Sequence, residues 1–256
     1  MPYTVRKNDI FVEVSHYHLK NPNKSMLSEE ENRERDTEAE SIARSKRLVI
    51  DYALNNPWTY FFTITLDTKN VGDRTAYEII TEKLLLCFEN QKKRNNKELA
   101  FLLIAEPHKR KEKNNKNAIH YHGLINIGQD NKLKFGEVFE YQNKHGQTCF
   151  ARESKLIRDS FGKNTFTAIY DTKEFLAYYV SKYISKAFKD NTIMLGKRFY
   201  KSQGLNQSIS GQYEDLKEFH GLGLEPTYKN QYATKWRITK EEYQFYIENG
   251  ILPSLE

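Results

Sequence analysis

Residues Lys173–Phe188, KEFLAYYVSKYISKAF, contain no Gly or Pro and carry apolar positions at helical spacing, which predicts a helix. At about 100° per residue, this helix has three stripes. One is apolar and suited to packing on a sheet, and a second faces water. On the third, two phenols and two ammonium groups share one face. The apolar stripe comprises Leu176, Ala177, Val180, Ile184, Ala187 and Phe188, the water-facing stripe Glu174, Ser181, Ser185 and Lys189, and the third stripe Tyr179, Tyr183, Lys182 and Lys186.

Alternating apolar, aromatic and β-branched residues predict strands elsewhere in the chain, and amphipathic runs predict further helices. A basic segment separates residues 99–106 from 118–127, so we expect these two strands to pair antiparallel. Residues 135–165 have the composition of an irregular insertion. The predicted strands lie within 3–20 and at 58–68, 99–106, 118–127 and 165–172, and the predicted helices at 28–54, 73–90, 173–188 and 239–249.

The strand predicted at 118–127 carries two histidines on one face. A period of two residues places His120 and His122 together, with apolar neighbours on the opposite face. Two imidazoles on one strand can chelate a divalent ion, although two ordinary strand-end histidines give the same pattern. Glu106 ends the neighbouring predicted strand and could supply an oxygen ligand. A His₂Glu set suits Mn²⁺ or Mg²⁺ and equally suits catalytic zinc.

A second His-Tyr-His sequence, His16–Tyr17–His18, follows a strand-like segment near the start of the chain. No predicted strand ending in a carboxylate precedes it, and a polar segment follows at once. We interpret these histidines as surface or supporting residues.

The tyrosine pair on the predicted helix has two interpretations. Tyrosines four residues apart are often half-buried core residues, with lysines extending past them. In the alternative interpretation, Tyr179 and Tyr183 are nucleophiles. A phenol has a pKa near 10, so it attacks phosphorus at neutral pH only when its proton is withdrawn or its charge is offset. A neighbouring ammonium group or a metal can provide that offset.

The overall composition limits the class of protein. The 256 residues are 38% hydrophobic and 13% aromatic, enough for a substantial core, and the formal charge of +6 favours a polyanionic partner. Cys87 and Cys149 have no metal-like spacing, and Cys87 lies in an apolar run expected in the core. The first residues lack the apolar core of a signal peptide, and no apolar run is long enough to span a membrane. These features predict a cytoplasmic protein without a membrane partner.

Two basic segments are candidate nucleic-acid contacts. The loop predicted at 108–117 has five Lys and Arg residues against one acidic residue. In the second segment, cations alternate with Phe199 and Tyr200, a combination suited to the phosphates and bases of single-stranded nucleic acid. Basic surface turns have a similar composition. The candidate contacts are Lys109, Arg110, Lys111, Lys197, Arg198 and Lys201.

Three segments occur in a meaningful order: FFTITLD at 61–67, IHYHGLI at 119–125 and YVSKYISK at 179–186. Together they resemble the three motifs of the HUH endonucleases, most closely the two-tyrosine rolling-circle replication initiators of microviral and filamentous phages. The resemblance covers about residues 57–205. It implies an α+β fold in which a central antiparallel, RRM-like sheet carries helices packed on its faces.

The resemblance also implies three roles for side chains: metal ligands, nucleophiles, and cations that offset a phenolate. We expect a nuclease domain at 57–205, flanked by accessory segments at 1–56 and 206–256. In this sequence the matching residues are His120, His122 and Glu106 as ligands of Mg²⁺ or Mn²⁺, Tyr179 and Tyr183 as nucleophiles, and Lys182 and Lys186 as cations.

The implied activity is the nicking of single-stranded DNA at a replication origin in a bacterial host cytoplasm, with a 5′-phosphotyrosine, a free 3′-OH and later rejoining. No GxxxxGK[ST] motif occurs, so we expect the helicase, like the polymerase, to be a host protein. Three alternatives stay open. They are a transposase or relaxase of the same superfamily, a non-catalytic binder of nucleic acid on an RRM-like sheet, and a metal-dependent hydrolase that uses water.

Overall fold

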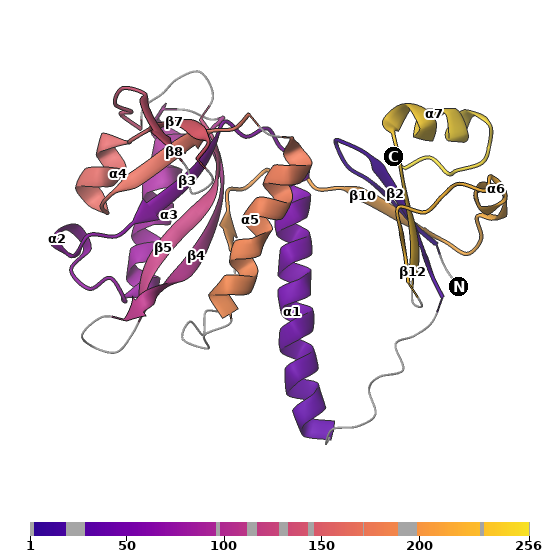
Figure 1. The fold of residues 1–256 in the computed structure, drawn as a ribbon, viewed down its shortest axis with the longest axis horizontal. Helices are drawn as coiled ribbons and strands as arrows, with labels where there is room; N and C mark the ends of the chain where they lie inside the picture. The colour runs from indigo at the N-terminus through magenta and orange to yellow at the C-terminus, as the bar shows by residue number, and fades with distance from the viewer. Residues whose placement is uncertain are drawn as a thin grey trace. The chain divides into compact units, whose positions relative to one another are not determined.

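The structure, a computed structural model, divides the chain into two compact units, which are described separately (Figure 1). Unit 1 combines Met1–Glu40 with Asn206–Glu256, and unit 2 is continuous over Ser41–Leu205. The described residues are 3–18, 29–95, 98–111, 117–127, 133–142, 146–170, 172–188, 199–230 and 233–255, with only the backbone described at 29–38, 94–95, 108–111 and 185–188.

Unit 2 is built on a sheet whose described strands number seven, in the order β6-β7-β8-β3-β5-β4-β9. Adjacent strands pair antiparallel. The central strands are rich in β-branched and aromatic residues, which suit a pleated surface covered on both faces. The strands are β3 (Tyr60–Thr65), β4 (Ala100–Lys111), β5 (Asn117–Asn126), β6 (Phe139–Gln142), β7 (Thr148–Arg152), β8 (Asn164–Ala168) and β9 (Tyr200–Lys201).

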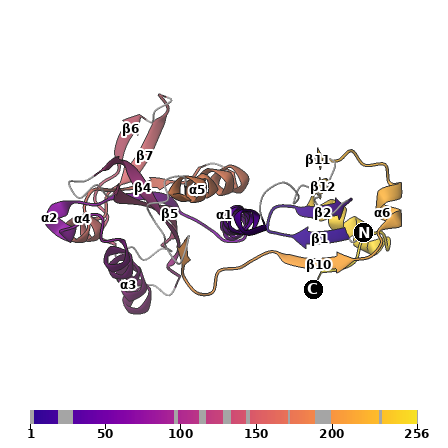
Figure 2. The ribbon, with the colours of Figure 1, turned by 90° about the horizontal axis from the view of Figure 1, so that it is seen from below.

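Helices pack on both faces of this sheet (Figure 2). On one face, α3 (Tyr77–Asn95) and α4 (Lys155–Ser160) bury apolar side chains in the main core. On the other face, α5 (Lys173–Phe188) contacts β4 and β5. The predicted α+β class, an antiparallel sheet with helices on its faces, is therefore confirmed. The main core includes Phe62, Ile64, Ile80, Leu84, Phe88, Phe101, Leu103, Tyr121, Ile157 and Phe166.

Two segments of unit 2 differ from their predicted structure. Residues 135–165, expected to be irregular, contain β6, β7 and α4. The side chains of β6 and β7 are mostly exposed, so these strands lack the apolar alternation by which buried strands are recognised. The segment 108–117, expected to be a loop, is partly strand, because β4 continues to Lys111, which pairs with Asn117 after an irregularity in the register. Backbone pairing can continue there without apolar side chains.

The helix predicted at 28–54 is α1 (Glu29–Leu54), and the division between the two units falls within it. Two side chains of the Asn-Asn-Pro sequence that follows the helix fix its end. The Asn55 amide donates to the carbonyl oxygen of Asp51 at 2.7 Å, and the Asn56 amide donates to that of Tyr52 at 2.9 Å. A short helix, α2 (Thr68–Val71), follows β3.

Unit 1 is a second antiparallel sheet, formed by both terminal segments, with the order β10-β1-β2-β12-β11. One of its faces carries a separate core that includes Val14, Phe219 and Trp236. The helix predicted at 239–249 is confirmed as α7, and Thr239 caps its first turn in a complete capping box. The elements are β1 (Tyr3–Lys7), β2 (Val12–Tyr17), β10 (Ile209–Tyr213), α6 (Lys217–Gly221), β11 (Tyr228–Lys229), β12 (Ala233–Ile238) and α7 (Lys240–Glu248).

Candidate active site

Three neighbouring strands of unit 2 bring the motif side chains to one face of the sheet. His120 of β5 is paired with Glu106 of β4, and His122 is paired with Thr63 of β3. Paired residues of an antiparallel sheet project to the same face. The alternate residue, Tyr121, is buried in the main core on the opposite face. The predicted division of the two faces of β5 is therefore confirmed.

His122 is held from three sides. Its Nε2 lies 2.8 Å from Oε2 of Glu106, and its Nδ1 lies 3.0 Å from Oγ1 of Thr63. Its ring stacks on that of Tyr183 with centroids 4.0 Å apart, and only 8% of the residue is exposed. Because a carboxylate oxygen only accepts, Nε2–H donates to Glu106 and Nδ1 accepts from the Thr63 hydroxyl. In the other tautomer Nδ1–H donates to Thr63, and the Nε2 lone pair is then available to a metal ion. Histidines that bind metal ions are oriented by a second hydrogen bond of this kind.

His120 lies beside this contact, with its ring centroid 6.4 Å from that of His122 and the ring planes 42° apart. Among the described residues, no group of three or more His, Cys, Asp or Glu side chains is arranged closely enough to hold a metal ion. Of the three predicted ligands, the structure thus brings His122 and Glu106 into direct contact and leaves the His120 ring next to them.

The two motif tyrosines lie one turn apart on α5 and hydrogen-bond to each other. The hydroxyl of Tyr183 donates to that of Tyr179 at 3.1 Å. Tyr183 is 6% exposed, whereas Tyr179 is half-buried. The Nζ of Lys182 lies 3.3 Å from the centroid of the Tyr179 ring and 5.0 Å from that of Tyr183, within the range of a cation–π interaction. The ammonium group therefore lies closest to the more accessible phenol.

The surroundings of the Tyr183 phenol disfavour its ionisation. Burial, followed by the hydrogen bond with Tyr179 and the nearby charge of Glu106, raises the pKa of the Tyr183 phenol. Its hydroxyl therefore keeps its proton at neutral pH and is suited to donate a hydrogen bond.

Phe61 fills the space between the motif side chains. Its ring centroid lies 5.2 Å from that of Tyr179, 6.1 Å from that of Tyr183 and 6.1 Å from that of His122. The sequence-based prediction treated this segment only as a strand and did not include Phe61 in the site. The available signal was its alternation with Phe62, which is fully buried in the core on the other face.

The apolar stripe of α5 is confirmed at its four described side chains, Leu176, Ala177, Val180 and Ile184, which are all buried. The water-facing stripe is not confirmed, because Glu174 is half-buried. Ser181, expected to face water, is 6% exposed and donates its hydroxyl to the carbonyl oxygen of Tyr178 at 2.9 Å. Phe175 lies about 40° from Tyr179 around the helix, on the tyrosine stripe, and was not recognised there. It is 56% exposed. The side chains of Ser185, Ala187, Phe188 and Lys189 lie outside the described part of the chain.

The predicted DNA contacts fall mostly outside the described side chains. Lys201, the last residue of β9, is exposed, and its Nζ lies 4.9 Å from the centroid of the Tyr52 ring. For Lys109, Arg110 and Lys111 of β4 and Lys186 of α5 only the backbone is described, and Lys197 and Arg198 lie outside the described residues.

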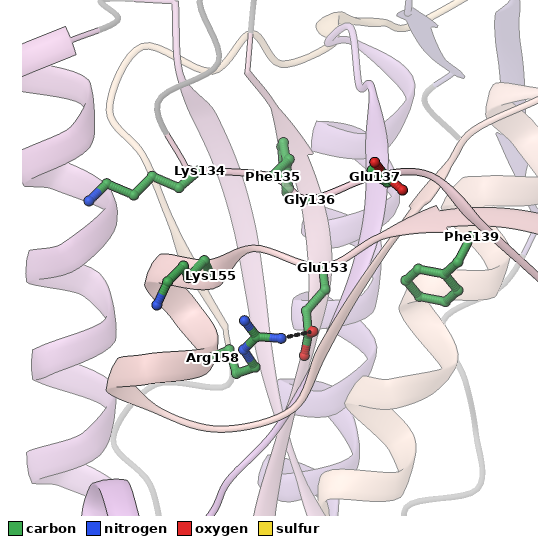
Figure 3. A pocket seen from close by; sticks show the side chains of 8 residues that line it. All are labelled: Lys134, Phe135, Gly136, Glu137, Phe139, Glu153, Lys155 and Arg158. Atoms are coloured by element: carbon green, nitrogen blue, oxygen red, sulfur yellow. Dashed lines mark hydrogen bonds and ion pairs between the residues drawn. The ribbon is translucent and has the colours of Figure 1, made fainter.

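A pocket of about 380 Å³ lies beside α4 and the segment that precedes β6 (Figure 3). Its lining includes the cations Lys134, Lys155 and Arg158. Arg158 forms an ion pair with Glu153 at 2.7 Å, and Lys155 pairs with Asp159 one turn along α4. Two of the three cations are thus already neutralised by carboxylates, and no motif residue lines this pocket.

An antiparallel sheet that carries two histidines beneath a helix with two tyrosines is the arrangement expected of a replication initiator. The family model of the replication-associated protein ORF2/G2P matches residues 59–188, just over half of the chain, and the chain belongs to this family. The match runs from the residue before β3 to the end of α5, so it contains all three motif segments. Membership supports a role in the initiation of rolling-circle replication and implies that the chain binds DNA at an origin.

No curated protein and no solved structure matches the chain significantly. Among the described helices, none is both long enough and apolar enough to cross a membrane.

Proposed function

We propose that the chain nicks single-stranded origin DNA by attack of a tyrosine on the scissile phosphate. The observation that carries this proposal is the stacking of Tyr183, hydrogen-bonded to Tyr179, on the ring of His122, which contacts Glu106. A pair of nucleophiles thus lies against groups suited to hold a metal ion. The replication-initiator family supplies the substrate class.

In the proposed reaction, the hydroxyl oxygen of Tyr179 forms a bond to phosphorus while the bond from phosphorus to the 3′ oxygen breaks. Tyr179 releases its phenolic proton to water, and the leaving oxygen takes up a proton, so the products are a 5′-phosphotyrosine and a strand with a free 3′-OH. Because the phosphodiester energy is conserved, attack by a 3′-OH can rejoin strands without a nucleotide cofactor. The free 3′-OH can prime a host polymerase, while a host helicase separates the strands.

We assign the first attack to Tyr179 because of its position. It is the more exposed phenol, its oxygen accepts the hydrogen bond of Tyr183, and Lys182 lies over its ring. A hydrogen-bond donor and a cation both stabilise negative charge on the attacking oxygen. Tyr183 acts first as that donor, and then as a second nucleophile when a new strand is cut while the first is still attached.

A divalent metal, Mg²⁺ or Mn²⁺, fits the donor set beside the tyrosines. His122 offers Nε2 while Thr63 holds Nδ1, and Glu106 directs an oxygen to the same point. His120, which the strand register sets opposite Glu106, is the third ligand in this proposal, and its side chain has to rotate to join the other two. When bound, the metal polarises the phosphate and stabilises charge on the leaving oxygen. Catalytic zinc sites use the same residue types, so the assay below compares metals.

The alternative of a non-catalytic, RRM-like binder requires exposed aromatic side chains on the central strands. Phe62 is fully buried in the core, and Phe61 packs between the tyrosines and His122. These positions favour the nuclease. A transposase or relaxase would share the chemistry, and the family favours an initiator.

The test is to incubate the full chain with labelled single-stranded DNA from its own genetic neighbourhood, with Mn²⁺, Mg²⁺ or Zn²⁺. Transfer of label to the protein is followed on a denaturing gel for wild type, Tyr179→Phe, Tyr183→Phe and the double variant. We expect a metal-dependent adduct that Tyr179→Phe abolishes for the first cut and the double variant abolishes entirely. Cleavage without an adduct would show a water nucleophile instead. Binding of DNA without cleavage would support the non-catalytic binder.

A further inference from the structure

Phe175 is a solvent-facing aromatic side chain on the same face of α5 as the two tyrosines. It precedes Tyr179 by four residues, and their ring centroids are 6.1 Å apart with planes inclined by 23°. Tyr183, Tyr179 and Phe175 form a row of aromatic rings along α5, and their exposed fraction rises from 6% at Tyr183, through the half-buried Tyr179, to 56% at Phe175. The row therefore reaches the solvent-exposed surface at Phe175, directly beside the proposed nucleophile.

Exposure alone does not mark a binding site, because scattered apolar side chains on a surface are normal. Phe245 of α7 is 58% exposed and also contacts a tyrosine, Tyr246, with ring centroids 5.8 Å apart. What distinguishes Phe175 is that its neighbour, Tyr179, is the residue that the proposed reaction joins to DNA. A strand whose phosphate lies at Tyr179 carries its adjacent unpaired bases within reach of the Phe175 ring. Aromatic rings stack on any base.

We propose that Phe175 stacks on a nucleobase next to the scissile phosphate and so positions single-stranded DNA for attack by Tyr179. This inference rests on the proposed function. Its ligand is an unpaired base of single-stranded DNA. Because stacking depends little on base identity, Phe175 fixes the position of the strand and leaves recognition of the origin sequence to other contacts. Phe175 is therefore a positioning residue for the nicking reaction.

The first test compares the kinetics of nicking on a labelled single-stranded oligonucleotide that spans the nick mapped with wild type. Because the adduct consumes the protein, rates are measured in single turnover, and KM and kcat here denote the half-saturating concentration and the maximal rate constant. Phe175→Ala is expected to raise this KM by roughly 5- to 150-fold, the range for alanine substitution of a base-stacking residue, with little change in kcat. Phe175→Trp and Phe175→Tyr keep an aromatic face and are expected to retain the wild-type KM. Phe245→Ala is the matched control, since it removes an equally exposed phenyl ring from a helix in unit 1, and is expected to have no effect.

The second test separates stacking from mere support of the Tyr179 ring, by using oligonucleotides with an abasic site on one side of the nick or the other. We expect wild type to have a raised KM on one of the two abasic substrates. On that substrate, Phe175→Ala should have the same KM as wild type, because the base that Phe175 would contact is already missing. If Phe175→Ala raised KM by the same factor, relative to wild type, on the intact substrate and on both abasic substrates, its role would be structural and the proposal would be overturned. A wild-type KM for Phe175→Ala, or a Phe175→Trp variant as impaired as Phe175→Ala, would overturn it too.

Failure of the proposed function has a different signature, because wild type then forms no adduct with any strand. The inference is still decided in that case by equilibrium binding of an oligonucleotide that carries 2-aminopurine, whose fluorescence is quenched by stacking. Weaker binding and lost quenching with Phe175→Ala, but not with Phe245→Ala, would support a base-stacking site at Phe175. Equal binding by both variants would exclude it.

Discussion

The tripeptide His-Tyr-His occurs once in each unit of this protein, in two different settings. In unit 2, the copy at 120–122 lies on a central strand, where Glu106 and Thr63 of the two neighbouring strands contact the second histidine at 2.8 Å and 3.0 Å. In unit 1, the first histidine of the copy at 16–18 stacks on the ring of Tyr3, with centroids 4.2 Å apart and planes inclined by 8°.

The copy in unit 1 is surrounded by other rings. The His16 ring lies 4.6 Å from that of His18 and 6.3 Å from that of His220, and its buried Nδ1 has no hydrogen-bond partner among the described residues. The nearest carboxylate along β2, Glu13, lies an odd number of residues away, on the other face, and pairs with Lys235 at 3.0 Å. The same tripeptide is thus a candidate metal site only where an adjacent strand places a carboxylate opposite it.

The most direct way to break this comparison is to remove one histidine from each copy. His122→Ala is expected to lower the rate of adduct formation by about 1000-fold, because it removes a ligand of the metal that stabilises phosphate charge, while DNA binding is largely kept. His18→Ala is expected to leave the rate unchanged. The rates are measured by transfer of labelled DNA to protein. Full activity of His122→Ala would refute the metal assignment.

Glu106→Gln tests the carboxylate that distinguishes the His-Tyr-His copy at 120–122 from the copy at 16–18. The amide keeps the shape of the side chain but loses its charge, so we expect the Mn²⁺ concentration for half-maximal adduct formation to rise by about 100-fold, with partial recovery at high Mn²⁺. The control is Glu13→Gln in unit 1, which should leave the metal requirement as it is. An unchanged metal requirement in Glu106→Gln would remove Glu106 from the ligand set.

Thr63→Val tests the hydrogen bond that orients His122. Valine has nearly the same shape as threonine but no hydroxyl, so we expect metal affinity to fall about tenfold. Thr63→Ser, which keeps the hydroxyl, should retain most of the affinity. Both are measured by titrating the metal in the adduct assay. Equal loss in the two variants would indicate packing of the threonine methyl group as the cause.

The smallest expected effect concerns pH and the copy in unit 1. Burial, and then the proximity of His18 and His220, lowers the pKa of His16. The unfolded chain therefore takes up the proton at higher pH than the folded unit does, and the free energy of unfolding of unit 1 falls as pH drops below about 6.5.

This pH dependence is measured by urea denaturation followed through the fluorescence of Trp236, which lies in the core of unit 1, in a Trp58→Phe background. His16→Phe keeps a stacked ring that cannot be protonated and should flatten the slope below pH 6.5. A slope identical to that of wild type would exclude His16 as its source.

Segments that pack against a hydrophobic core have a regular pattern of apolar and polar residues, and these segments were predictable from the sequence. Strand β5 is rich in apolar residues, and helix α5 buries one face, so these segments were identified from their composition and helical period. The placement of His120 and His122 on one side of β5 followed from the period of two. The edge strand β6 and its neighbour β7 bury few side chains and were missed. The assembly of unit 1 was not predictable either. The spacing of apolar residues identifies single strands but not their partners, and β2 pairs with β12, more than 200 residues away.

Within the candidate site, sequence placed residue types on faces but did not resolve their contacts. The contact of Glu106 with His122, although the register opposes it to His120, depends on side-chain direction. The different exposure of Tyr179 and Tyr183 depends on which strands lie under α5. The roles of these residues in metal binding and attack stay predictions until the variants above are measured.

The assembly of unit 1 from both ends of the sequence sets the order in which the protein can fold during its synthesis. Strand β1 pairs with β10 and strand β2 with β12, so until those partners are synthesised β1 and β2 form at most a two-stranded hairpin with each other, which is marginally stable in water. Unit 2 is continuous and can fold as a domain once residue 205 has emerged. Strands β1 and β2 therefore reach their partners β10 and β12 only after the whole of unit 2 has been synthesised.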